Sequence, residues 1–128
     1  MKTLPGSHQD LLNGTNTAVF TTIGDDGLPQ STAVWFLARD GQIEVSTRKG
    51  LRKFHNVQAR PVACVFILDP ANPWRFIEVR GSITWHEDPT CELRDAVAAK
   101  HGMDGSKFDP PGTQRVRLVL TPERINCR

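Results

Sequence analysis

The stretch EVSTRKGLRKFHN, residues 44–56, starts as a strand and ends as a short basic helix. Apolar Ile43 and Val45 alternate around Glu44, a pattern that is typical of a strand. Apolar residues then recur every three positions over 51–57, which predicts a short helix with one buried edge. The fold is therefore expected to turn from sheet to helix at this point.

Hydroxyls and cations are concentrated where this strand meets the helix. Ser46 and Thr47 end the strand, and four cations follow within six residues: Arg48, Lys49, Arg52 and Lys53. On a helix, Lys49, Lys53 and Asn56 would share one face. Hydroxyls at a strand end and cations beside a helix N-terminus can together hold a phosphate. We predict an anion site here, with a solvated basic helix face as the alternative.

The composition describes one soluble domain. A chain of 128 residues is long enough for one hydrophobic core and short for two, so residues 1–128 are expected to form a single domain. The 38% hydrophobic and 23% charged residues are ordinary for a soluble globular protein. A net charge of +2 is too small to demand a nucleic-acid partner, and none is predicted.

Cysteine and histidine spacing predicts no metal site. The three cysteines, Cys64, Cys91 and Cys127, are widely separated and form no CxxC pair, which favours a reducing compartment over a disulfide framework or zinc. The four histidines also lack ligand spacing. No segment resembles a signal peptide or reaches the ~20 apolar residues of a membrane helix. We therefore expect a cytoplasmic protein with no membrane partner.

Alternation and turn signals predict a succession of strands. They are expected over residues 17–23, 30–38, 42–46, 61–68, 74–87 and 114–120. Beside the basic helix, further helices are expected over 8–13, with Ser7 as its cap, and over 88–100. Residues 102–113 are expected to form a loop.

The pattern of these strands indicates a mainly β fold. Turns at 24–27 and 40–41 connect the first three strands as an antiparallel meander. The almost wholly apolar 61–68 strand should be buried on both faces or lie at the centre of a barrel, and Gly81 should mark a bulge or a sharp bend. Six or so antiparallel strands with a few short helices predict a small closed or half-open barrel.

No side chains with an evident catalytic arrangement accompany the predicted anion site. The sequence has no Ser-His-Asp or Cys-His arrangement, and no glycine-rich dinucleotide motif between a strand and a helix. An enzyme of this kind would depend on a cofactor for its chemistry. Trp35, Phe36 and Trp74 could flank an aromatic ring system, although such residues more often belong to the core.

Four segments in this order resemble a known family. They are GLPQSTAVWF (27–36), IEVSTRKGLRKFHNV (43–57), RPVACVFILDP (60–70) and WRFIEVRGSI (74–83). The chain is similar to the pyridoxamine 5′-phosphate oxidase-like family of flavin and deazaflavin proteins, and within it to coenzyme F420 (deazaflavin)-dependent oxidoreductases of the biliverdin-reductase-like branch. This resemblance implies an antiparallel split β-barrel of six to seven strands.

The resemblance also implies a homodimer with two cofactor sites in grooves between the subunits. On this reading of the family, Ser46, Thr47 and Lys53 would hold the cofactor phosphate, with Arg52 and Asn56 near by.

The same resemblance implies contacts to the rest of the cofactor. Four residues would line the isoalloxazine or deazaflavin ring: Gln30 and the backbone around Ala33, Val34 and Trp35. Trp74 of the partner would cover the ring or tail. Arg48 and Lys49 would suit the carboxylate-bearing tail of F420, which FMN lacks.

The function implied is an F420-dependent reductase that transfers hydride to a conjugated small-molecule acceptor. The C-terminal PERINCR lacks the Trp-x-Arg-Leu-type ending of true pyridoxamine phosphate oxidases, so that reaction is not expected. An FMN-binding relative and a non-catalytic flavin- or deazaflavin-binding module remain the alternatives.

Overall fold

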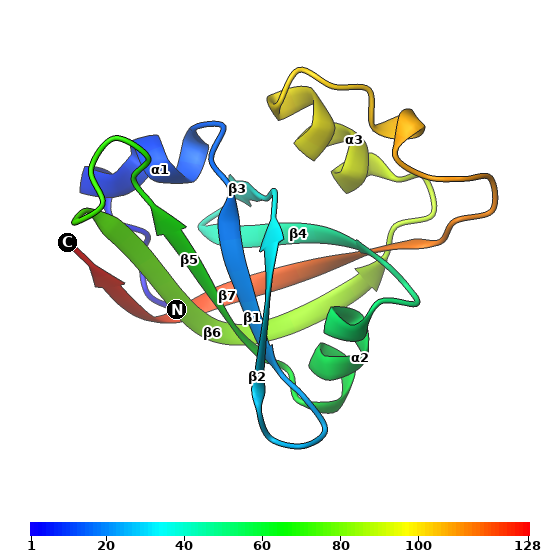
Figure 1. The fold of residues 1–128 in the computed structure, drawn as a ribbon, viewed down its shortest axis with the longest axis horizontal. Coiled ribbons are helices and arrows are strands. Elements are labelled where there is room, and N and C mark those ends of the chain that lie inside the picture. Colours follow the sequence, from blue (N-terminus) through cyan, green and yellow to red (C-terminus); the bar gives the residue numbers. More distant parts are fainter.

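Seven antiparallel strands form one strongly curled sheet in the computed structural model, which describes residues 1–128 (Figure 1). The strands are β1 (Ala18–Ile23), β2 (Pro29–Val34), β3 (Leu37–Arg39), β4 (Gln42–Arg48), β5 (Val62–Leu68), β6 (Phe76–Glu87) and β7 (Arg115–Cys127). Their order across the sheet is β2-β1-β5-β6-β7-β4-β3. The prediction of a mainly β split barrel with six to seven strands is confirmed.

Short helices cover parts of the barrel. They are the 3-10 helices η1 (Gly6–His8) and η2 (Gly105–Lys107) and the α-helices α1 (Gln9–Asn13), α2 (Arg52–Ala59) and α3 (Glu92–Lys100). In Figure 1, α1 lies at one end of the barrel, whereas α2 and α3 lie on the other side, below and above β4. None of the helices is both long and apolar enough to span a membrane.

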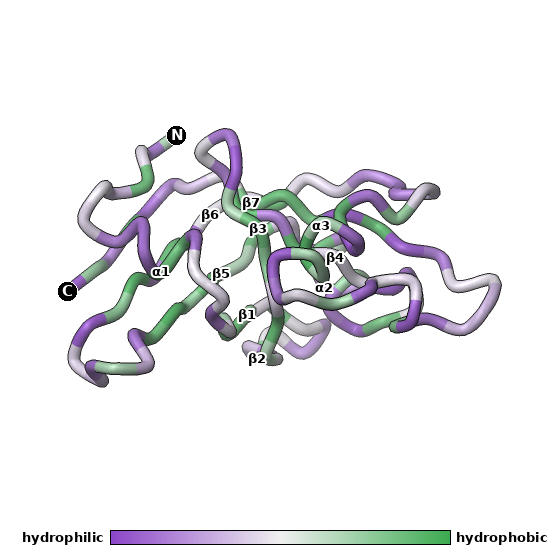
Figure 2. Tube along the Cα trace, turned by 90° about the horizontal axis from the view of Figure 1, so that it is seen from above, coloured by the Kyte–Doolittle hydropathy of each residue, from purple (hydrophilic) through white to green (hydrophobic).

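The core fills the inside of the curled sheet. A single cluster of 18 buried hydrophobic residues includes Phe20, Ile43, Val65, Ile77 and Leu118. Figure 2 shows the hydrophobic segments following the strands through the middle of the molecule and the hydrophilic ones at the loops. Burying each large apolar side chain stabilises the fold by about 1.5–3 kcal/mol, so this cluster is the main source of stability.

The predicted strand over 30–38 is in fact two strands. β2 ends at Val34 and pairs with β1, whereas β3 begins at Leu37 and pairs with β4. Phe36, between them, is fully buried. The strand breaks because β2 and β3 are the two opposite edges of the sheet, and the chain must cross from one edge to the other at this point.

Of the two predictions for 61–68, burial on both faces is wrong for this chain, whereas β5 does lie inside the sheet, between β1 and β6. Ala63, Val65 and Ile67 of β5 are buried, but Val62 and Leu68 on the other face are 47% and 43% exposed. The run is apolar throughout because one face of β5 lies in the core and the other, also hydrophobic, lies at the surface.

Three predicted element boundaries also change. The strand expected to end at Leu120 continues to Cys127, because β7 pairs with β6 along the whole length of β6. The helix expected over 88–100 begins at Glu92, where Asp88 accepts hydrogen bonds from the first backbone N–H groups. Ser7, the predicted cap of 8–13, lies inside η1 and makes no capping hydrogen bond.

Gly81 lies at a bulge, as predicted. Arg80 faces Arg124 across the β6–β7 ladder, whereas Gly81 faces Pro122, so Glu123 is an extra residue in β7. The two strands approach so closely here that a Cβ atom on residue 81 would lie 1.9 Å from the carbonyl oxygen of Thr121. Backbone on both sides leaves no flexible group that could move away.

Replacing Gly81 with alanine should therefore destabilise the protein. We expect Gly81→Ala to lower the free energy of unfolding by about 1–3 kcal/mol, the usual range for overpacking, in urea denaturation followed by circular dichroism. Gly6→Ala is the control, because a Cβ atom there meets nothing within 4 Å. Equal stabilities of the two variants would contradict the close approach of β6 and β7.

Candidate functional site

A cleft with a volume of about 230 Å³ lies at the end of β4, between α2 and α3. Seven of the residues that line it were predicted from the sequence as site residues: Ala33, Val34, Trp35, Ser46, Thr47, Arg48 and Lys53. Segments far apart in the sequence meet here because the curled sheet brings the end of β2 near the end of β4. The residue roles assigned above stay predictions, but these seven share one cavity.

The hydroxyl groups at the end of β4 lie in the wall of the cleft. Thr47 is 2% exposed, and its hydroxyl oxygen has no hydrogen-bond partner. The side-chain hydroxyl of Ser46 has one hydrogen-bond partner, Arg115, whose Nη1 lies 3.4 Å away. A buried polar atom without a partner costs about 1–3 kcal/mol, so the site suits a ligand that supplies the missing hydrogen bond.

Lys53 projects from the first turn of α2 into the same cleft. Burial lowers the pKa of the Lys53 ammonium group, and the positive charge of Arg115 near by lowers it further. No carboxylate of the chain offsets these effects. An anion bound in the cleft would relieve both.

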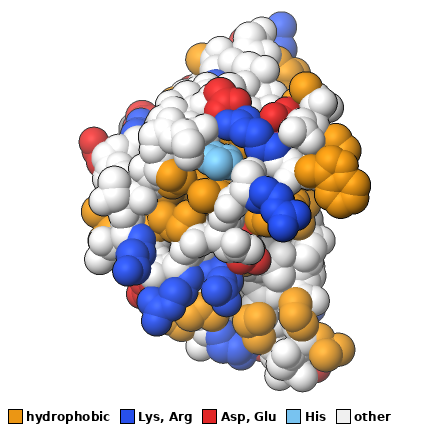
Figure 3. Space-filling model, turned by 90° about the vertical axis from the view of Figure 1, so that its left-hand side faces the viewer, with side chains coloured by type: hydrophobic (Ala, Val, Ile, Leu, Met, Phe, Trp, Pro, Cys, Tyr) orange, Lys and Arg blue, Asp and Glu red, His pale blue; other side chains and the backbone are white.

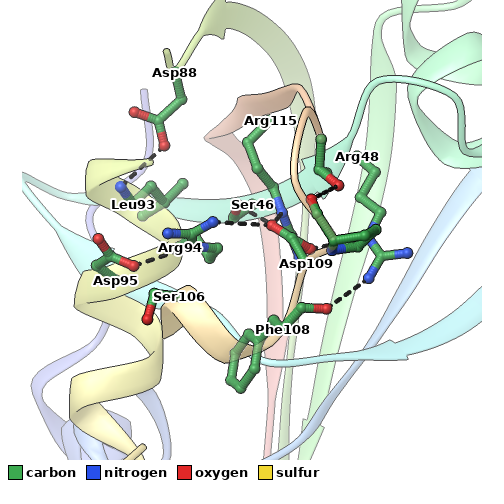
Figure 4. Close-up of polar contacts among 12 residues, drawn as sticks. Ser46, Arg48, Asp88, Leu93, Arg94, Asp95, Ser106, Phe108, Asp109 and Arg115 are labelled. Carbon is green, nitrogen blue, oxygen red and sulfur yellow. Dashed lines mark hydrogen bonds and ion pairs between the residues drawn. The ribbon is translucent and has the colours of Figure 1, made fainter. Parts of the chain in front are cut away.

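Three arginines of the cleft converge on one buried carboxylate, that of Asp109 (Figure 4). Arg115 donates two hydrogen bonds to it, at 2.7 and 2.8 Å. Arg94 of α3 and Arg48 of β4 each donate one at 3.1 Å. Hydrogen bonds from these guanidinium groups, above all that of Arg115, hold the pKa of the Asp109 carboxyl far below its usual range.

The cleft carries an excess of positive charge. Lys53 and the three arginines provide four cations, which face the buried Asp109 and the exposed Asp95, a partner of Arg94. Four cations against two carboxylates leave an excess of two positive charges in a partly desolvated site. Such a site attracts an anion more strongly than the same charges would in water.

The remaining walls of the cleft are apolar. Leu51, Val97 and Phe108 line it together with Trp35. The ring of Trp35 stacks on His101 with centroids 3.8 Å apart and planes inclined by 4°. The cleft therefore combines a cationic end with an apolar wall that could contact a flat ring.

Two of the predicted site residues hydrogen-bond to each other outside this cleft. The fully buried Asn56 donates to Gln30 at 2.8 Å and to Thr22 at 3.0 Å. Arg52, with Gln30 and Asn56, lines a separate depression beside the turn at Gly24.

Lys49 and Trp74 also lie away from the cleft. Lys49 pairs with Glu87 at 2.5 Å, and Trp74 is 76% exposed in the connection between β5 and β6. The prediction that Lys49 shares a helix face with Lys53 and Asn56 is wrong, because α2 begins at Arg52 and Lys49 precedes it.

Four residues at the cleft were not predicted from the sequence: Arg94, Phe108, Asp109 and Arg115. The expected loop over 102–113 contains η2, and its Asp109 is buried and held by three ion pairs. No local pattern marks these residues, because their partners are supplied by β4, α3 and β7. No group of three or more His, Cys, Asp or Glu side chains is placed to hold a metal ion.

Comparison with known proteins agrees with this architecture. The family model described as pyridoxamine 5′-phosphate oxidase matches residues 4–127. A solved structure named as an F420 reductase is 26% identical, with a TM-score of 0.86, over 96% of this chain and 98% of that one. No curated protein matches the sequence.

Two further solved structures share the fold at lower identity. A conserved hypothetical protein from Mycobacterium tuberculosis is 20% identical, with a TM-score of 0.80, over 99% of this chain and 89% of that one. The General Stress Protein 26 of Bacillus anthracis is 21% identical, with a TM-score of 0.70, over 93% and 88%. Because the family model spans nearly the whole sequence, the chain belongs to the pyridoxamine 5′-phosphate oxidase family.

Proposed function

We propose that the protein is an F420-dependent oxidoreductase that binds the deazaflavin cofactor in the cleft between α2 and α3. One observation carries the proposal: unpartnered Thr47 and Lys53 lie beside three clustered arginines in a single partly apolar cavity. The likeness to an F420 reductase, at 26% identity and a TM-score of 0.86, supports this choice of cofactor. The bound cofactor would supply hydride for a conjugated small-molecule acceptor.

The polar end of the cleft fits the anionic part of such a cofactor. Ser46, Thr47 and Lys53 offer two hydroxyls and an ammonium group to a phosphate. Arg48 and Arg115 would complement further negative charge on the tail. Guanidinium groups suit both phosphates and carboxylates, because they donate parallel hydrogen bonds to two oxygens.

The apolar wall fits the ring system. Ala33 and Val34 are the last two residues of β2, and Trp35 adds a large aromatic surface beside them. These groups would orient the ring and exclude water from one side of it.

The cleft supplies no evident acid–base pair. No carboxylate, histidine or cysteine is among its lining residues. Proton delivery to the acceptor would then come from solvent. The same observation favours a second candidate, a non-catalytic protein that binds a flavin or deazaflavin.

A homodimer would complete the site. The outer face of the sheet exposes Val19, Val62 and Leu68, and the stacked rings of Phe66 and Phe76 adjoin them. Figure 3 shows hydrophobic side chains reaching the surface in several patches on the side that carries α1 and the C-terminus. A second copy packed on this face would bury the apolar side of β5 and could bring its own Trp74 to the cleft.

Lys53→Ala should weaken cofactor binding by ~1.5–3 kcal/mol, the range for a hydrogen bond to a charged group. This corresponds to a roughly 10- to 150-fold rise in Kd for F420, measured by fluorescence titration of the folded protein. Lys53→Arg should retain most of the affinity, because it keeps the charge. Lys2→Ala is the control, because it removes one positive charge at a residue that does not line the cleft, and it should leave the Kd unchanged.

The same titration separates the cofactors. Tight binding of FMN without binding of F420 would replace our cofactor assignment by the FMN alternative. Unchanged F420 affinity in Lys53→Ala would place the phosphate elsewhere.

Turnover separates the enzyme from the binding module. We expect reduced F420 to be oxidised in the presence of the protein and a conjugated acceptor from a panel of quinones, enones and tetrapyrroles, followed by absorbance. Tight cofactor binding without turnover of any acceptor would favour the non-catalytic candidate.

The dimer can be tested independently of the cofactor. Leu68→Glu places a charge on the exposed apolar face and should convert a dimer into a folded monomer, measured by light scattering after gel filtration. Leu28→Glu, at an exposed leucine beyond the sheet face in the β1–β2 turn, should leave the dimer intact. A monomeric wild-type protein would contradict the proposed assembly.

A further inference from the structure

Asp109 makes contacts that the proposed function does not explain. It lies between η2 and β7, and its side chain is only 3% exposed. Each of its two oxygens accepts two N–H groups, Oδ1 from Arg48 and Arg115 and Oδ2 from Arg94 and Arg115. One carboxylate therefore joins side chains from β4, α3 and β7 (Figure 4).

The same contacts leave part of each guanidinium group free. Arg48 uses Nε on Asp109 and Nη2 on the carbonyl of Phe108, so its Nη1 has no partner. Arg94 uses Nη1 on Asp109 and Nε on Asp95, so its Nη2 is free. Nη1 of Arg115 has only the contact of 3.4 Å to Ser46.

Without Asp109, these three guanidinium groups would not stay together. They are like charges in a partly buried site, and each arginine side chain has many rotamers to choose from. A buried carboxylate that accepts hydrogen bonds from all three offsets their repulsion and fixes their planes. Arg48, which Asp109 holds, also donates to the carbonyl of Phe108, a residue that lines the cleft.

We infer that Asp109 is a positioning residue that holds Arg48, Arg94 and Arg115 with their free nitrogens available to the anionic part of the ligand. The inference rests on the proposed function only in that it places an anion in the cleft. The expected effect of Asp109 on anion affinity is the opposite of the effect that its negative charge alone would have. A negative charge beside an anion site should weaken anion binding, whereas a positioning carboxylate strengthens it.

The sign of this effect is the test. Asp109→Asn keeps the shape of the side chain but removes its charge, and we expect the Kd for F420 to rise about tenfold or more. Pyrophosphate, as a simple anionic probe, should lose affinity in the same way in isothermal titration calorimetry. Asp95→Asn is the matched control, since it removes an exposed carboxylate that also pairs with Arg94, and its anion affinity should stay equal or increase.

A second variant keeps the inference testable if Asp109→Asn does not fold. Asp109→Glu keeps the charge but moves the carboxylate by one methylene, and its anion affinity should also fall severalfold. Circular dichroism gives the folded fraction at the temperature of each titration, so that the affinity refers to folded protein.

Several outcomes would overturn the inference. Equal or tighter anion binding by folded Asp109→Asn or Asp109→Glu would reduce Asp109 to a structural or competing role. A wild-type protein that binds neither F420 nor pyrophosphate would remove the anion site itself. Pyrophosphate binding that depends on Asp109, without binding of F420, would support the inference and reject the proposed cofactor.

Discussion

The two-residue connection between β2 and β3 constrains the whole structure. These strands are the opposite edges of a seven-stranded sheet, yet only Trp35 and Phe36 separate them along the chain. The sheet must therefore curl until its edges nearly meet. Phe36 turns into the core, and Trp35 stays at the rim, where it lines the cleft. The curl that brings the two edges of the sheet together therefore also places Trp35 in the wall of the cleft.

Charge determines what this cleft can hold. Its cations come from four elements and face too few carboxylates to be neutralised, and one of its hydroxyls has no partner. Such features lower the stability of the protein without a ligand. They are usual at sites where a bound ligand supplies the missing hydrogen bonds and neutralises the excess charge. The apolar wall beside them suits a ligand that also has a less polar part.

Much of the architecture could be predicted because its signals are local. Alternating residues marked the strands, and Gly81 marked its bulge. The site could be predicted only where its residues are adjacent, as at Ser46 and Thr47 before the basic helix. Asp109 and its arginines are distant in sequence, and only the fold brings them together. The exposed side of β5 could not be predicted, because an apolar run does not reveal whether one face of the strand or both are buried by the rest of the chain.

The position of β7 in the sheet has a consequence for folding. This strand lies between β6 and β4 and is the last of the seven to be synthesised. Until it emerges from the ribosome, β3–β4 has no backbone pairing with the other four strands, and β4 and β6 each leave a backbone edge unpaired. The complete sheet thus cannot form before this strand is available. It must wait for a late, non-local step, a topology that slows folding and leaves the nascent chain open to aggregation.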